Sequence, residues 1–153
     1  MININVLSEE NGWSKKLKKK NLFFKDICKA LPSKYKFPKK KVSFSVMLSN
    51  NTKIKKLNFF YRKKNKPTDI LSFPSYDRLK ISNKTYIGDI IISFNFINKP
   101  KSQNIKEFKK KFIKIFIHGF LHLIGFDHKK NSEYKEMYKE EEYIYKTVIK
   151  KLT

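Results

Sequence analysis

The chain of 153 residues is 40% hydrophobic and 15% aromatic, which excludes a disordered basic tail and fits one globular domain spanning residues 1–153. Its formal net charge of +23 would attract a nucleic-acid backbone, although only Arg62 and Arg78 are arginines and the excess of lysine also fits the residue usage of an A+T-rich genome. The single cysteine, Cys28, excludes an internal disulfide and fits a reducing compartment.

The first third of the chain is predicted to form a strand, a helix and a second strand. Residues 1–7 alternate apolar and polar side chains, which indicates an opening strand and not the leader of a secreted protein. Apolar residues from Leu17 to Leu31 recur at helical spacing until Pro32 ends the helix. Residues 42–49 alternate again, as expected of a half-buried strand.

The middle of the chain predicts a short helix followed by two strands. Thr52 can cap a helix whose C-terminal end carries Arg62. Residues 70–73 and 87–94 are the two strands, and the polar segment 75–85 is long enough for an antiparallel return between them. The second strand is a continuous apolar run, which is typical of a central position in a sheet.

Two helices complete the chain. The first bears His118 and His122, and the second runs from about Ser132 to Lys150 with acidic residues in its first turn and lysines in its last. The whole order predicts an α+β fold, a four-stranded mixed sheet with helices packed on it. The longest apolar stretch, around residues 115–126, is too short to cross a bilayer, so we expect a cytoplasmic protein without a membrane partner.

All three histidines lie in one segment, HGFLHLIGFDH at residues 118–128. His118 and His122 are four residues apart, so on a helix both imidazoles leave the same face one turn from each other. Gly125 can adopt the left-handed conformation that ends a helix, which lets the chain turn back and bring His128 to the same point. Three imidazole nitrogens with a fourth position open are typical of a catalytic zinc site, here on a central helix and the turn that follows it.

The surroundings of the histidines favour metal binding over simple burial. Apolar residues flank them nearly all round the helix, which predicts a buried position. A single histidine there would more often be a core residue with a hydrogen-bond partner. Burying two imidazoles without partners would cost about 1 to 3 kcal/mol each, and a metal ion removes that cost by accepting a lone pair from each ring. We therefore expect one Zn²⁺ ion held by His118, His122 and His128.

The same spacing occurs in the metzincin proteases, which leaves a zinc-dependent peptidase as an alternative. In those proteases the residue after the first histidine is a glutamate, which acts as the general base for attack on the peptide. Gly119 occupies this position here and cannot accept a proton. The ligand pattern is therefore present without the base of the protease.

Several segments together resemble the YbeY-type bacterial rRNA maturation factors. The histidine segment is similar to their signature H-G-x-L-H-L-x-G-Y-D-H, with Phe126 in place of the tyrosine, which removes no ligand. Residues 57–62 (LNFFYR) and 67–74 (PTDILSFP) resemble the family's L-N-x-x-Y-R and P-T-D-V-L-S-F-P segments. Gly88-Asp89-Ile90 resembles its G-D-I strand, and Glu133, Met137 and Glu141 resemble positions of its last helix. The matches follow the family's order from about residue 54 onward.

The resemblance implies a metal-dependent, single-strand-specific endoribonuclease that acts in 16S rRNA 3′ end processing and in ribosome quality control. Its partners would be ribosomal RNA and components of the small ribosomal subunit. Arg62 is then the candidate catalytic residue, because its planar guanidinium can hold two oxygens of the substrate phosphate. Without the resemblance, Arg62 could equally be a surface residue near the end of a helix.

Other roles stay open at the level of the sequence. Asp127 is expected to cap the turn and not to act as the general base. Activated water and the 2′-OH of the RNA are both candidates for the attacking group. A further alternative is a non-catalytic ribosome-assembly factor in which zinc only braces the fold.

Overall fold

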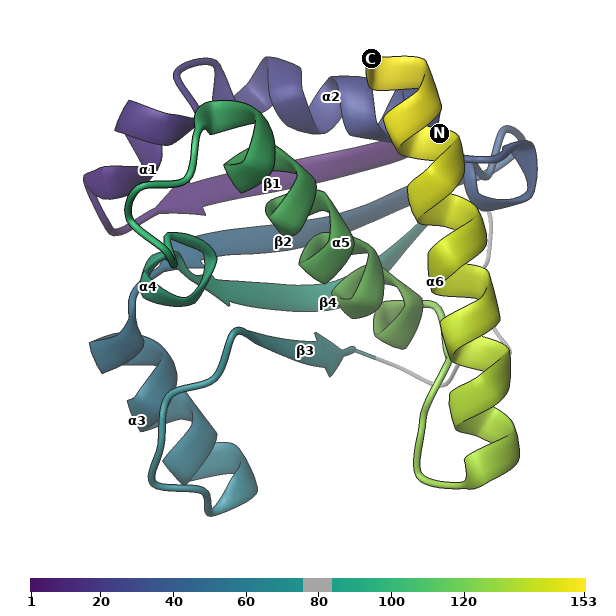
Figure 1. Ribbon diagram of the computed structural model, residues 1–153. Coiled ribbons are helices and arrows are strands. Elements are labelled where there is room, and N and C mark those ends of the chain that lie inside the picture. Colours follow the sequence, from purple (N-terminus) through teal and green to yellow (C-terminus); the bar gives the residue numbers. More distant parts are fainter. Residues whose placement is uncertain (76–83) are drawn as a thin grey trace.

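The computed structural model describes residues 1–75 and 84–153, which form one mixed sheet with helices packed on it (Figure 1). The strands are β1 (Ile2–Ser8), β2 (Lys41–Ser49), β3 (Ile70–Pro74) and β4 (Lys84–Ser93), in the order β1-β2-β4-β3. Both β1 and β4 pair in parallel with β2, whereas β3 is antiparallel to β4. The predicted α+β class is confirmed, and β4 has a strand on each side as its apolar run indicated. Most of the connection predicted for residues 75–85 lies outside the described residues.

The helices are α1 (Gly12–Lys16), α2 (Lys20–Ala30), α3 (Asn51–Arg62), α4 (Phe94–Ile97), α5 (Ile105–Leu123) and α6 (Asn131–Leu152), with a 3-10 turn at Ser33–Tyr35. Figure 1 shows α5 crossing one face of the sheet, α6 beside it, and α3 beyond the β3 edge. α5 packs on β3 and β4, and α6 packs on α5 and α2. Among the described residues, no helix has the length and hydropathy needed to cross a membrane.

Two boundaries differ from the sequence prediction. The helix predicted from Leu17 begins only at Lys20 in α2, because Leu17 and Lys19 have non-helical backbone angles, and the short helix α1 precedes it. Buried Trp13 ties α1 to the end of β2 by donating from Nε1 to the Ser49 carbonyl at 2.9 Å. At the start of α3 the cap is Asn50 and not Thr52, since the Asn50 side chain accepts from the Lys53 N–H at 3.0 Å.

The core fixes the rotation of α5 about its own axis. Phe112, Phe116 and Phe120 recur every four residues and are at most 1% exposed. Phe116 and Phe120 pack on Phe44 of β2, with ring centroids 6.1 and 5.8 Å away. Burial of each such ring contributes about 1.5 to 3 kcal/mol, so this face of α5 is held toward β2. Residues about half a turn away on α5 therefore point toward the β3 side of the molecule.

Candidate metal centre

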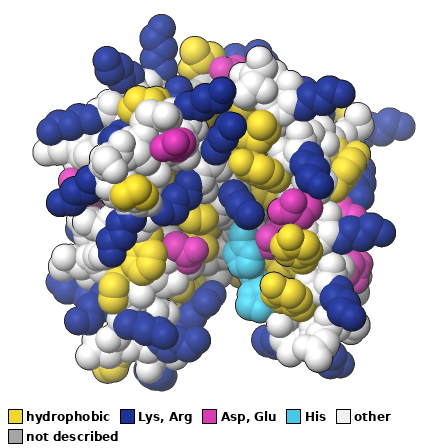
Figure 2. All heavy atoms as spheres, viewed as in Figure 1, with side chains coloured by type: hydrophobic (Ala, Val, Ile, Leu, Met, Phe, Trp, Pro, Cys, Tyr) yellow, Lys and Arg dark blue, Asp and Glu magenta, His cyan; other side chains and the backbone are white. Residues whose placement is uncertain are grey.

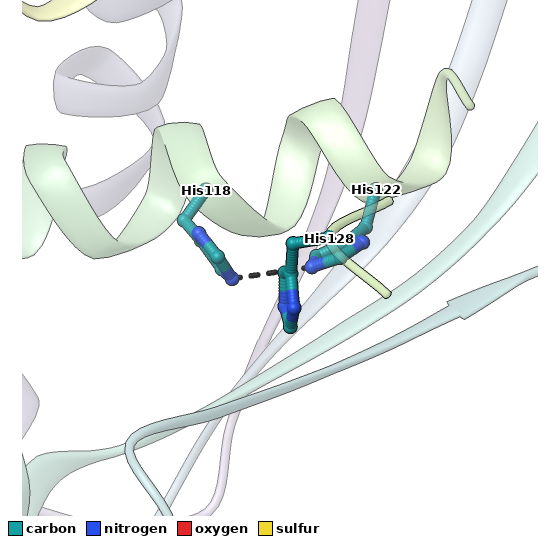
Figure 3. Close-up of side chains that lie close together, drawn as sticks. All are labelled: His118, His122 and His128. Carbon is teal, nitrogen blue, oxygen red and sulfur yellow. Dashed lines mark hydrogen bonds between the residues drawn. The ribbon is translucent and has the colours of Figure 1, made fainter. Parts of the chain in front are cut away.

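The C-terminal half of α5 carries His118 and His122 on the side turned away from the core phenylalanines. His118 Nε2 lies 3.1 Å from His122 Nε2, and Figure 3 shows the two rings converging. His128, from the segment after α5, completes the group (Figure 3). One ring nitrogen from each of the three lies within 4.8 Å of the others. The structure thus brings together the three histidines that the sequence spacing singled out, while their assignment as metal ligands stays a prediction.

A tight turn after α5 returns the chain to the cluster. Gly125 has a φ of 118°, which L side chains rarely adopt, and the Phe126 N–H donates to the Leu121 carbonyl at 2.9 Å. Asp127 Oδ1 then accepts a hydrogen bond from the His128 N–H at 2.8 Å. Asp127 therefore supports the turn, which is the role its position in the sequence favoured.

Two oxygen atoms orient the rings of α5. Glu141 Oε1, from α6, lies 2.5 Å from His118 Nδ1, and the Phe126 carbonyl oxygen lies 3.0 Å from His122 Nδ1. Because an oxygen acceptor binds the protonated nitrogen of a neutral imidazole, these partners place the ring protons on Nδ1 and leave the Nε2 lone pairs facing the cluster. Two ligands of a tetrahedral zinc with Zn–N bonds of about 2.0 to 2.1 Å are separated by about 3.3 Å. The donor set and its 3.1 Å spacing fit such an ion.

Burial also favours the protonation state that a metal requires. Desolvation, and then the neighbouring charges of His118 and His128, lower the pKa of His122 to about 4. The His122 ring is therefore neutral at pH 7. Only the neutral ring has a lone pair to give to a metal ion.

Gly119, at the position of the protease glutamate, packs against β3. A Cβ atom at this position would lie 2.4 Å from Ile70 Cδ1 and 3.0 Å from Ser72 Oγ. Ser72 Oγ also donates to the Gly119 carbonyl oxygen at 3.2 Å, which joins α5 directly to β3. The Ile70 and Ser72 atoms both belong to side chains of β3, so a larger residue at position 119 would require these side chains to shift.

The three histidines line a cleft of about 380 Å³. Arg62, at the C-terminal end of α3, lines the same cleft, as do Thr68, Asp69 and Lys114. Figure 2 shows histidine side chains in the wall of a notch between the α3 side and the α6 side of the molecule. Within residues 1–75 and 84–153, no carboxylate is paired with the exposed Arg62 guanidinium. The structure thus brings the predicted arginine to the cleft of the predicted histidines.

Sequence reasoning did not assign roles to two charged residues of the cleft. Glu141 reaches His118 only because α6 packs on α5, and the two residues are 23 positions apart. Lys114 lies one turn before His118 on α5, but nothing in the sequence distinguishes it from the many other lysines. No local pattern carries either signal, because both depend on the tertiary arrangement.

Fold and cleft together define a class of protein. It has an α+β fold with a mixed sheet and a cluster of three histidines whose cleft is also lined by an exposed arginine. This arrangement is suited to metal-assisted chemistry on an anionic substrate. Comparison with known proteins narrows the class. The sequence model described as "Endoribonuclease YbeY" matches residues 5–149. The chain therefore belongs to the YbeY endoribonuclease family, which confirms the resemblance seen in its motifs.

Individual relatives agree with this membership. The protein named "Endoribonuclease YbeY" from Pelagibacter ubique (strain HTCC1062) is 53% identical over 152 residues, covering 99% of each chain. The protein of the same name from Buchnera aphidicola subsp. Acyrthosiphon pisum (strain APS) is 40% identical over 134 residues, covering 87% of this chain and 81% of the relative. The solution structure of TM1509 from Thermotoga maritima superposes with a TM-score of 0.58 at 28% identity, covering 95% of this chain and 89% of that one.

Proposed function

We propose that the protein is a zinc-dependent endoribonuclease that cleaves single-stranded ribosomal RNA in 16S rRNA 3′ end maturation and in ribosome quality control. The observation that carries the proposal is the convergence of three histidine nitrogens within 4.8 Å in a cleft that Arg62 also lines. Membership in an endoribonuclease family supports the reaction type.

Each residue of the cleft has a role in this proposal. When bound, a zinc ion supplies Lewis acidity toward a phosphoryl oxygen and lowers the pKa of water. His118, His122 and His128 would hold that ion, and Glu141 keeps the His118 ring oriented. Arg62 binds two oxygens of the scissile phosphate through its planar guanidinium and stabilises the negative charge that develops there.

The electrostatics of the whole chain support an RNA partner. A net charge of +23 produces a long-range electrostatic attraction for the phosphate backbone of RNA. Lys114 adds a positive group to the wall of the cleft, 3.8 Å from Glu142 on α6. We propose ribosomal RNA and the small ribosomal subunit as partners, the cytoplasm as the compartment, and residues 1–153 as a single domain.

The geometry of the cleft favours the endoribonuclease over the two alternatives, a peptidase and a non-catalytic assembly factor. A metzincin-like peptidase needs a base beside the first histidine, and Gly119 has no side chain that could accept a proton. A non-catalytic assembly factor does not require Arg62 to lie in the same cleft as the histidines, whereas a nuclease needs a phosphate-binding group there. The endoribonuclease accounts for both features.

Cleavage of a single-stranded RNA by the purified protein tests the proposal, with bound metal measured in the same preparation. We expect about one zinc ion per chain and a loss of cleavage of at least about 100-fold in His118→Ala and Arg62→Ala. Lys63→Ala, the neighbouring exposed cation on the same helix end, should cleave like the wild type. His118→Ala protein that cleaves as fast as the wild type would point to a contaminating nuclease and remove the enzyme assignment.

A further inference from the structure

Two exposed tyrosines on α6 take no part in the chemistry proposed above. Tyr134 and Tyr138 are 58% and 52% exposed, although each ring would be more stable if it were buried. Aromatic rings gathered on a surface beside a functional cleft are typical of a binding site. Figure 2 shows hydrophobic side chains of this kind on the α6 side of the notch, next to the histidines.

Helical geometry points the two tyrosines toward the metal centre. Tyr134, Tyr138 and Glu141 are spaced i, i+4 and i+7 along α6, so they share one side of the helix. The Glu141 end of that side is fixed to the cleft by its 2.5 Å contact with His118. With a rise of about 1.5 Å per residue, Tyr138 lies about 4.5 Å and Tyr134 about 10.5 Å from Glu141 along the helix axis. The tyrosines therefore lead outward from the histidines along one wall of the notch.

The two rings are arranged to receive flat ligands. They lie nearly parallel, with an interplanar angle of 15° and centroids 6.4 Å apart. Exposed, nearly parallel aromatic faces of this kind can each stack a base of a single strand. The nearby Lys130 and Lys135 are exposed and can attract the phosphates of such a strand.

We infer that Tyr134 and Tyr138 form a base-stacking platform for the one or two nucleotides next to the cleaved phosphate. The inference rests on the proposed ribonuclease function and adds how the cleft selects single strands. A base within a duplex has both faces covered by its neighbours, whereas a base in a single strand can place a face on a tyrosine ring. Because α6 forms only one wall of the notch, the platform acts on one side of the cleaved bond.

Single-stranded RNAs in which one nucleotide at a time lacks its base test the platform. Binding is measured by fluorescence anisotropy on zinc-loaded protein in an Arg62→Ala background, which prevents cleavage, and the cleavage position is mapped separately with the protein that keeps Arg62. With both tyrosines in place, removing a base within about two nucleotides of the cleaved bond, on one side only, should weaken binding about tenfold. The double variant Tyr134→Leu/Tyr138→Leu should bind intact RNA at least about tenfold more weakly and should show no further loss with the abasic RNA.

Tyr143→Leu is the matched control. Tyr143 is on the same helix and 49% exposed, but it lies about 200° around the axis from Glu141, with Lys34 Nζ 5.3 Å from its ring centroid. The same substitution there should leave RNA binding unchanged. Leucine keeps the apolar bulk and the helix propensity, so all variants should melt within about 2 °C of the wild type.

The outcomes separate the platform from the function on which it rests. If the wild type cleaves RNA but the double variant binds intact RNA as tightly, or stays sensitive to the abasic positions, the platform is refuted and the ribonuclease stands. If the wild type with bound zinc cleaves no RNA, both fall.

Discussion

The Glu141 carboxylate allows a quantitative test of the metal centre. Its Oε1 lies 2.5 Å from His118 Nδ1, and its side chain is only 18% exposed, so water competes weakly for the contact. A carboxylate in this position strengthens the opposite nitrogen as a donor and fixes the orientation of the ring. We predict that Glu141→Gln, which keeps an acceptor oxygen but loses the charge, weakens zinc binding about tenfold. Glu141→Ala, which loses both, should weaken it about 100-fold, or about 2.7 kcal/mol.

Competition with a chromophoric chelator at neutral pH measures these zinc affinities. Glu142→Gln is the control, because Glu142 is the next residue on α6 and its nearest cation, Lys114, is 3.8 Å away. That variant should bind zinc like the wild type. At saturating zinc, Glu141→Gln should regain most of its RNA cleavage, since the loss lies in holding the ion. Equal zinc affinity in Glu141→Ala and the wild type would refute the reasoning that this carboxylate supports His118.

Three further predictions follow from other contacts. Gly119→Glu, which creates the protease pattern, should lose about 2 kcal/mol or more of unfolding free energy, because position 119 is buried and the new carboxylate would lose its water there. A wild-type melting temperature would mean that the cleft accommodates a carboxylate at this position. Chelation of zinc should lower the melting temperature by about 5 to 10 °C, since an ion present at a concentration 100 times its dissociation constant contributes about 2.7 kcal/mol of stability. An unchanged melting curve would contradict zinc binding. Burial tends to raise the pKa of Glu140, but hydrogen bonds from Lys34 and Tyr35 outweigh it and lower that pKa overall. The stability that this contact contributes is present above the ordinary carboxyl pKa of about 4.3, and it is lost as the pH falls through the pKa of the folded protein. The difference in melting temperature between the wild type and Glu140→Gln should therefore shrink from about pH 6 to about pH 3. A constant difference would exclude this linkage.

Periodicity in the sequence was sufficient to predict the elements that carry the site. The alternation in β2, the apolar run of β4 and the helical spacing around His118 are signals that a few neighbouring residues determine. Because these signals are local, they could not give the two boundaries that were predicted wrongly, the cap of α3 and the start of α2. Thr52 and Asn50 are both good capping residues, and the choice between them depends on where β2 ends. The short helix α1 is held by a hydrogen bond from Trp13 to Ser49, which is 36 residues away, and such a distant contact is not visible in local spacing.

The site was predictable only in part for the same physical reason. His118, His122 and His128 converge through one helix and one turn, and such short-range geometry is encoded in their spacing. The geometry at Glu141 depends on how α6 docks on α5, which the spacing of residues does not specify. The family motifs pointed to Arg62, but its place in the cleft depends on strand order.

Strand order connects the arginine to the histidines. α3 follows β2 and precedes β3, yet β4 lies between these two strands in the sheet, so α3 must carry the chain past β4 to the sheet edge. That edge is where Gly119 of α5 packs on β3, and Figure 1 shows α3 beyond it. Buried Asn58 fixes the path of the chain from α3 to β3, because its side-chain amide donates to the Lys66 carbonyl at 2.9 Å and ties the segment after Arg62 to α3. If β3 paired with β2 instead, α3 would not have to reach the edge where α5 presents its histidines. The insertion of β4 between β2 and β3 is therefore the topological condition for a cleft that holds both the histidine cluster and Arg62.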